Sequence, residues 1–176
     1  MKDSKLIQKL HSGDKEAAGI IIERYYEDIY RFCLYMVQIE ADAYDITQET
    51  FLKFMKYGSS YKHNNLKGYL LTIARNICFD YFRNKSQKAA AADWEELDKY
   101  QTRTDRMAET EDAVYLKYLL KELSEDIRVV VILRTYEEMR FKDIAKIMGC
   151  SLSTAKSRYR LGISQLKRMM ENEYER

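Results

Sequence analysis

The 176-residue sequence contains no proline, and glycine occurs only six times. These two residues interrupt helices most often, and elsewhere in this sequence the apolar residues recur every three or four positions. Both observations favour an all-helical protein. No apolar run approaches the roughly 20 residues that span a bilayer. The N-terminal stretch MKDSKLIQKLHSGD also lacks the apolar segment of a signal peptide. We therefore expect a cytoplasmic protein.

Histidine and cysteine are also scarce, with two and three residues. Cys33, Cys78 and Cys150 are far apart in the sequence, so we expect neither a disulfide framework nor a zinc site. We interpret them as reduced structural residues, although Cys150 lies beside a predicted turn, where a redox response is the alternative. The sequence shows no nucleophile paired with a base, no metal cluster and no phosphate loop. We expect no catalytic residue, no metal, no cofactor and no enzymatic activity.

The charge of the chain is nearly balanced overall, at +2, but it is unevenly distributed. Basic residues gather at 62–88 and 156–168, whereas acidic residues gather at 93–98 and 109–112. Two basic blocks on either side of an acidic segment indicate two contacts with a polyanion.

The apolar spacing in the first half of the chain predicts helices separated by short breaks. The expected helices are 3–11, 15–38, 42–56 and 66–86, with a loop at 56–65. Gly13 suits the left-handed residue after a helix, and Asp14 suits the N-cap of the next helix. On the third helix the spacing places Phe51, Phe54 and Met55 inward.

The second half of the chain begins with a polar and acidic stretch. We interpret residues 87–111 as a linker, although the alanine run within it could extend the preceding helix. Further helices are expected at 112–122, 125–137, 141–148 and 152–171. The predicted architecture is all-α, with small helical domains at 1–86 and 112–176.

The stretch FKDIAKIMGCSLSTAKSRY predicts a helix-turn-helix. Ala145 allows close helix approach, Gly149 suits the tight turn and Ser151 suits the N-cap of the second helix. The second helix of this motif begins with hydroxyl and cationic side chains, which are the types that bind phosphates and base edges in a major groove. The alternative is an ordinary helix pair with a solvated basic face. The candidate DNA-binding residues are Ser153, Thr154, Lys156, Ser157, Arg158 and Arg160.

Aromatic residues are interspersed with cations over residues 57–85. Aromatic rings stack on unpaired bases, amides bind base edges and cations hold the backbone, so single-strand binding and ordinary core packing are both open here. Upstream, Asp45, Gln48 and Glu49 share one polar face of a helix. An acidic face repels DNA, which leaves a solvated face or a protein-docking face.

These blocks resemble, in this order, the extracytoplasmic-function (ECF) sigma factors of bacterial RNA polymerase. DAYDITQETFLKF looks like the family's region 2.2, and LKGYLLTIARNICFDYFRN resembles regions 2.3 and 2.4. LSEDIRVVVILRTYEEMRFKDIAKIMGCSLSTAKSR resembles region 4. The likeness covers roughly 14–86 and 112–170. One departure is Leu161, which stands where a basic residue is common and is followed by Gly162.

The resemblance implies a role and a partner for each block. The first domain is implied to bind the clamp helices of the largest subunit of core RNA polymerase, through Asp45, Gln48, Glu49, Phe51 and Lys53. The implied minus-10 residues are Lys62, His63, Asn64, Asn65, Arg75, Asn76 and Arg83. The second domain is implied to read the minus-35 element of promoter DNA with residues 153–160, and to lie near the flap region of the polymerase. Family members are commonly held inactive by an anti-sigma factor, often membrane-anchored.

The function that follows is promoter-specific transcription initiation. Unstacking a base costs a few kcal/mol, and a pocket that binds only the extruded base offsets that cost. Two alternatives remain open. One is a stand-alone helix-turn-helix regulator. The other is a nucleic-acid-processing enzyme that holds a metal ion with Asp45 and Glu49, one helical turn apart.

Overall fold

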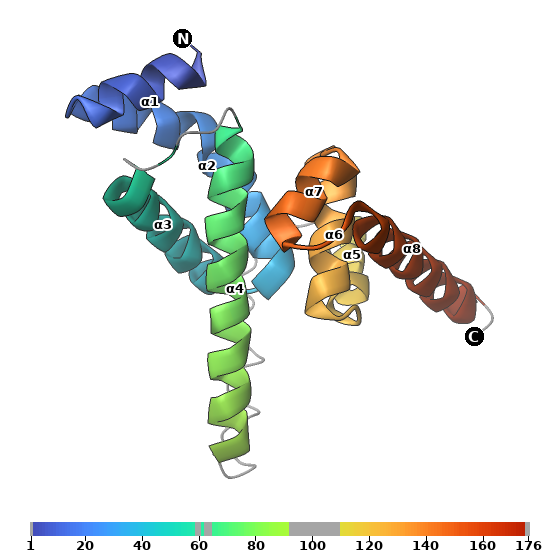
Figure 1. Cartoon of the computed structure of the whole chain (residues 1–176). Coiled ribbons are helices and arrows are strands. Elements are labelled where there is room, and N and C mark those ends of the chain that lie inside the picture. The colour runs from blue at the N-terminus through green and yellow to red at the C-terminus, as the bar shows by residue number, and fades with distance from the viewer. Residues whose placement is uncertain (1, 59–60, 62–64, 92–109, 175–176) are drawn as a thin grey trace.

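The computed structural model describes residues 2–58, 61, 65–91 and 110–174, and helix is the only regular secondary structure in those ranges. The predicted all-α fold is confirmed. The predicted residues Lys62, His63 and Asn64, and most of the predicted linker, lie outside the described residues. The helices are α1 (Asp3–His11), α2 (Lys15–Val37), α3 (Glu40–Tyr57), α4 (Leu66–Ala91), α5 (Glu111–Lys121), α6 (Glu125–Thr135), α7 (Phe141–Met148) and α8 (Leu152–Tyr174) (Figure 1).

Helices α1–α4 form a first bundle around α2, which packs against α1, α3 and α4. The predicted start of α2 is confirmed. Gly13 has φ +86°, and the Asp14 carboxylate accepts a hydrogen bond from the Glu16 amide at 2.9 Å. Helix α4 continues to Ala91 rather than ending near residue 86. The alanine run therefore extends this helix, because alanine has the highest helix propensity.

The inward side of α3 differs from the predicted one at Met55, which is 41% exposed. Two threonines take core positions instead. Thr47 donates to the Ala43 carbonyl at 2.7 Å and Thr50 donates to the Ile46 carbonyl at 2.8 Å. These bonds satisfy both hydroxyls within the helix, so the threonines can be buried at low cost.

Helices α5–α8 form a second bundle, in which α6 and α7 pack against α8. The predicted helix-turn-helix is present. Gly149 has the left-handed φ of +60° in the turn, and the Ser151 hydroxyl accepts from the Thr154 amide at 3.1 Å at the start of α8. Gly162 is buried in α8, where a Cβ atom would lie 2.5 Å from a methyl group of Val131. A glycine at this position lets α6 and α8 approach closely.

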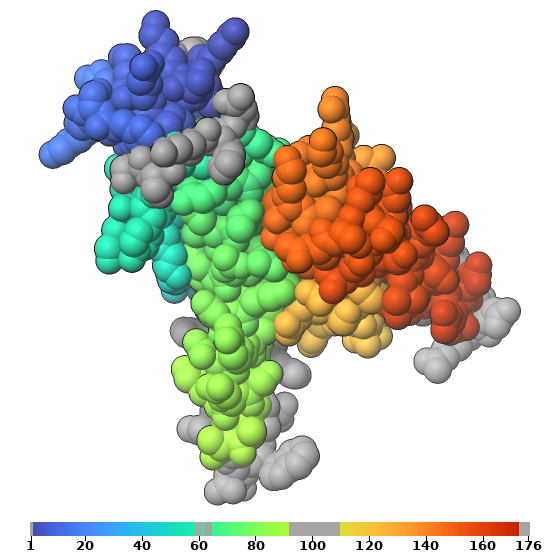
Figure 2. Space-filling model, viewed as in Figure 1, coloured from blue at the N-terminus to red at the C-terminus, as the bar shows by residue number. Residues whose placement is uncertain are grey.

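The two bundles are in contact with each other. Helix α2 packs against α5 and α6, and α4 packs against α7. Figure 2 shows α4 and α7 meeting along one face of the molecule. Among the described residues, no helix combines the length and the apolar character that crossing a membrane requires.

Candidate protein and nucleic-acid interfaces

Helix α3 presents a mixed polar and apolar face. Asp45, Gln48 and Glu49 are all exposed, as the polar spacing predicts. Between them and the end of the helix stands Leu52, whose side chain is 68% exposed. Tyr44 is also exposed, at 48%. Large apolar side chains framed by polar ones are typical of a protein-binding surface. Leu52 lies about opposite Phe54 on the helix, so the spacing alone could have indicated its exposure. The exposure of Tyr44 has no such signal, because its position is close to the side of the buried Phe51.

Two other predicted residues of this helix lie differently. Phe51 is only 5% exposed, so its ring supports the face from within the core. Lys53 reaches back one turn, and its ammonium lies 2.9 Å from the Glu49 carboxylate. This exposed ion pair lies along the edge of the α3 face and occupies the Glu49 carboxylate that the metal-binding alternative requires. Nowhere in the described part of the chain do three potential metal ligands gather.

The start of α4 places Asn65 at the edge of the undescribed residues 62–64. Asn65 is exposed, and its side-chain oxygen accepts a hydrogen bond from the Gly68 amide at 2.9 Å. The residue therefore caps α4. The side-chain amide nitrogen is its remaining donor toward a ligand.

About three turns further along α4, Arg75 and Asn76 interact directly. The Arg75 guanidinium donates to the Asn76 side-chain oxygen at 2.6 Å and lies over the Phe79 ring, 5.1 Å from its centroid. Burial lowers the pKa of Arg75, and the negative charge of Asp126 on α6 opposes that shift. Its Nε atom is buried without a hydrogen-bond partner. Arg83 lies on the exposed end of α4 and pairs with Asp80.

Helix α8 presents most of the predicted minus-35 residues to solvent. Ser153, Lys156, Ser157 and Arg160 are exposed, and Thr154 is half-buried beside the cap. Arg158 instead turns toward α6, where its guanidinium lies 3.2 Å from the Asp126 carboxylate. This pairing separates Arg158 from the exposed cations. A shallow groove then continues along α8 past Arg160, lined in part by Ser164, Lys167 and Arg168.

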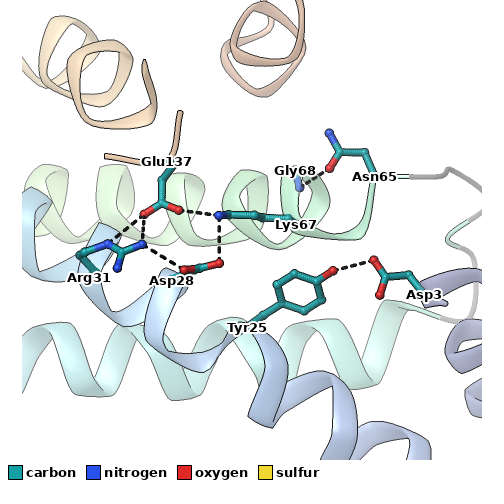
Figure 3. A network of polar contacts seen from close by, with 8 residues as sticks. All are labelled: Asp3, Tyr25, Asp28, Arg31, Asn65, Lys67, Gly68 and Glu137. Atoms are coloured by element: carbon teal, nitrogen blue, oxygen red, sulfur yellow. Dashed lines mark hydrogen bonds and ion pairs between the residues drawn. The ribbon is translucent and has the colours of Figure 1, made fainter. Parts of the chain in front are cut away.

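A polar cluster lies between the bundles, at the turn that follows α6 (Figure 3). Glu137 reaches α2 and α4, where its carboxylate lies 3.0 Å from the Arg31 guanidinium and 2.7 Å from the Lys67 ammonium. Asp28 contacts the same two cations, at 3.0 and 2.9 Å. Burial works to lower the pKa of Lys67, but its bonds to Glu137 and Asp28 outweigh that effect and raise it. No spacing pattern in the sequence indicates this cluster, because its residues come from α2, α4 and the turn after α6.

Comparison with known proteins divides the chain at the same place as the fold. The family model described as Sigma-70 region 2 matches residues 21–88, and the one described as Sigma-70, region 4 matches residues 113–166. The ECF RNA polymerase sigma factor SigM of Bacillus subtilis is 30% identical over 138 residues, covering 78% of this chain and 85% of SigM. SigW of the same organism is 26% identical and covers 98% of both chains. BldN of Streptomyces coelicolor is 25% identical over 96% of this chain, which spans 66% of BldN.

Two solved structures share the fold. One is the sigma factor RpoE in complex with the anti-sigma factor NepR from Bartonella quintana, with a TM-score of 0.70 and 23% identity over 87% of this chain and 96% of that one. The other is CnrH in complex with the cytosolic domain of CnrY, with a TM-score of 0.75 and 18% identity over 97% of both chains.

Proposed function

This chain belongs to the ECF family of RNA polymerase sigma factors, and we propose that its two bundles divide promoter recognition between them. As a member of this family, the chain binds core RNA polymerase and directs promoter-specific transcription initiation. In our proposal α1–α4 bind the polymerase and the minus-10 element, whereas α5–α8 bind the minus-35 duplex. The main support for this division of roles between the bundles is the exposed face of α3, on which the Leu52 side chain is 68% exposed.

The α3 face fits a protein partner better than a nucleic acid. Leu52 and Tyr44 supply apolar contact area, and the polar rim comes from Asp45, Gln48 and the Glu49–Lys53 pair. The carboxylates of this face repel the phosphates of a nucleic acid, whereas a protein partner can bind these carboxylates with an amide or a cation. We infer that this face binds the clamp helices of the largest polymerase subunit, with Phe51 supporting it from beneath. A stand-alone helix-turn-helix regulator needs no such face.

The minus-10 element is assigned to the start and middle of α4. Asn65 and Asn76 offer amides for base edges, and Arg75 and Arg83 offer cations for the backbone. We place Lys62, His63 and Asn64 in the same site. A base extruded into this site gains contacts that a paired base cannot make, which offsets the few kcal/mol of unstacking. Melting then depends on sequence and needs no ATP, and the chain itself catalyses no reaction.

The minus-35 element is assigned to the exposed side of α8. Its first turns project Ser153, Lys156, Ser157 and Arg160 from a helix-turn-helix, which is the arrangement that enters a major groove. Thr154 lies beside them, and Arg158 has a smaller part because Asp126 already engages it. In this arrangement the second bundle also lies near the flap region of the polymerase.

We further propose an anti-sigma factor as a partner and the cytoplasm as the location. RpoE and CnrH, which share this fold, each form a complex with another protein, NepR in one case and the cytosolic domain of CnrY in the other. The family resemblance extends this to a regulator that is often membrane-anchored. The polymerase itself is cytoplasmic in bacteria, so the chain must meet it there.

The deciding experiment compares two double variants of the full chain. Gln48→Ala with Glu49→Ala should weaken binding to core polymerase, measured by fluorescence anisotropy, by about tenfold. Lys156→Ala with Arg160→Ala should leave that affinity unchanged and lower run-off transcription from a minus-35-dependent promoter. Equal losses in both assays would contradict the division of labour.

The two alternatives give different results with the unmodified protein. Site-specific binding to duplex DNA that core polymerase does not alter would identify a stand-alone regulator. Magnesium-dependent cleavage of nucleic acid that Asp45→Ala abolishes would identify an enzyme.

A further inference from the structure

Glu137 belongs to the second bundle, but its ion-pair partners belong to the first. Its side chain has 0% exposure, although glutamate is among the residues least often buried. Arg31 donates to one carboxylate oxygen from Nε and Nη2, at 3.2 and 3.0 Å. The Lys67 ammonium lies 2.7 Å from the other oxygen. Both oxygens therefore face a cation from α2 or α4 (Figure 3).

The arrangement matches the way proteins bind phosphate. In the structure the Arg31 guanidinium binds one carboxylate oxygen of Glu137 and the Lys67 ammonium binds the other. The same two cations could bind two oxygens of a backbone phosphate equally well. Glu137 and Asp28 together balance the charges of Arg31 and Lys67. If Glu137 withdraws, one positive charge remains uncompensated on the surface of the first bundle.

The position of the pair relates it to the proposed minus-10 site. Lys67 is two residues beyond Asn65, in the first turn of α4. Helix α7 packs against α4, and the Asp126 carboxylate of α6 acts on the half-buried Arg75. The second bundle thus lies against the side of α4 that carries Lys67 and Arg75. A strand bound along this side of α4 and the packed arrangement of the two bundles exclude each other.

We propose that Glu137 stands in for a promoter phosphate, holding the two bundles together on Arg31 and Lys67 until the opened chain binds a phosphate of the minus-10 strand there. The inference rests on the proposed function, since it requires that the first bundle bind promoter DNA. It adds Arg31 and Lys67 to the DNA-binding surface and gives Glu137 an inhibitory role.

The test uses two variants that break the same ion pair from opposite sides. Glu137→Gln removes the competing charge and leaves both cations, so the full chain without polymerase should bind a fluorescent 12-nucleotide single strand about threefold to tenfold more tightly. Lys67→Ala also breaks the pair but removes a phosphate contact. It should weaken the same binding and reduce the salt dependence by about one phosphate contact.

Matched controls separate these effects from charge alone. Glu138→Gln changes a neighbouring exposed glutamate, and Lys5→Ala removes an exposed cation on α1. Both should bind the strand within twofold of the parent chain. A purely structural role for the ion pair predicts shifts of the same sign for Glu137→Gln and Lys67→Ala, and that result would overturn the proposal. Equal affinities for Glu137→Gln and Glu138→Gln would overturn it too.

A second measurement needs no substitution and so does not depend on how well a variant folds. A carbodiimide should join Lys67 to Glu137 directly in the parent chain, because the two groups lie 2.7 Å apart. Saturating single strand should reduce the yield of this cross-link, read by mass spectrometry, and an undiminished yield would refute the competition. Failure of the parent chain to support run-off transcription with core polymerase would instead reject the proposed function.

Discussion

The guanidinium of Arg128 donates a hydrogen bond to the backbone carbonyl of Met36 at 2.6 Å, across the boundary between the two bundles. The same side chain donates to the carbonyls of Lys121 and Leu123 at 3.0 and 3.1 Å. It also lies over the Phe82 ring of α4, 5.5 Å from the centroid. One buried cation therefore joins α2, α4 and the loop before α6.

Arg128→Ala should lower the free energy of unfolding by about 2 to 4 kcal/mol, because three backbone carbonyls lose a charged donor and two of these hydrogen bonds are buried. Urea denaturation followed by circular dichroism measures this. Arg140→Ala removes an exposed arginine at the start of α7 and should change the stability by less than about 0.5 kcal/mol. Similar values for the two variants would show that Arg128 does not stabilise the packing.

Leu52→Ala should weaken binding to core polymerase by about tenfold while leaving the thermal stability unchanged. The side chain is 68% exposed in the free chain, so its truncation removes contact with a partner rather than core packing. Val114, on α5, is 53% exposed and provides the matched control. Val114→Ala should leave the affinity within twofold of the parent, measured by the same anisotropy titration. An unaffected Leu52→Ala variant would mean that the polymerase binds elsewhere.

Gly162→Ala and Gly19→Ala should shift the melting temperature in opposite directions. A Cβ atom at Gly162 would lie 2.5 Å from Val131 and 2.8 Å from Ile127, so α6 and α8 must separate, which should lower the free energy of unfolding by about 1 to 3 kcal/mol. The stiff rotamers of these β-branched residues limit any other relief. Nothing lies within 4 Å of a Cβ atom at Gly19, which is exposed in the second turn of α2. Alanine there should stabilise the chain by up to about 1 kcal/mol through helix propensity. Shifts of the same sign would disprove the packing argument.

Lys156→Ala and Arg160→Ala should differ in how they depend on promoter sequence. A lysine that contacts a phosphate contributes to the binding of every duplex alike. Lys156→Ala should therefore weaken the binding of all sequences and reduce the slope of log affinity against log salt concentration by about 1. An arginine on a base edge discriminates, so Arg160→Ala should cost about 1 to 3 kcal/mol on the preferred minus-35 sequence only. Holoenzyme binding to a library of minus-35 variants at two salt concentrations resolves the two patterns. Lys121→Ala, an exposed lysine on α5, is the control and should change neither.

The local features of this molecule follow from neighbouring residues, and the sequence was sufficient to predict them. The start of α2, the Asp14 and Ser151 caps and the left-handed Gly13 and Gly149 depend on contacts within a few residues, so propensity and spacing reveal them. The end of α4, at Ala91, differs from the predicted one. The exposure of Asp45, Gln48 and Glu49 follows from the same periodicity. Recognition of the family rests on these local blocks and on their order.

The tertiary structure alone decided the features that join distant segments. Thr47 and Thr50 displaced Met55 from the core because the packing of α3 on α2 and α4, and not hydrophobicity alone, selects the inward side. The need for a glycine at position 162 of α8 follows from the packing of Val131 of α6 against it, which the sequence does not reveal. Arg31 and Glu137 are 106 residues apart, and a single ion pair at such a separation has no periodic signature in the sequence. Its existence depends on how two separately predictable bundles dock, and docking is governed by surface complementarity that no local pattern records.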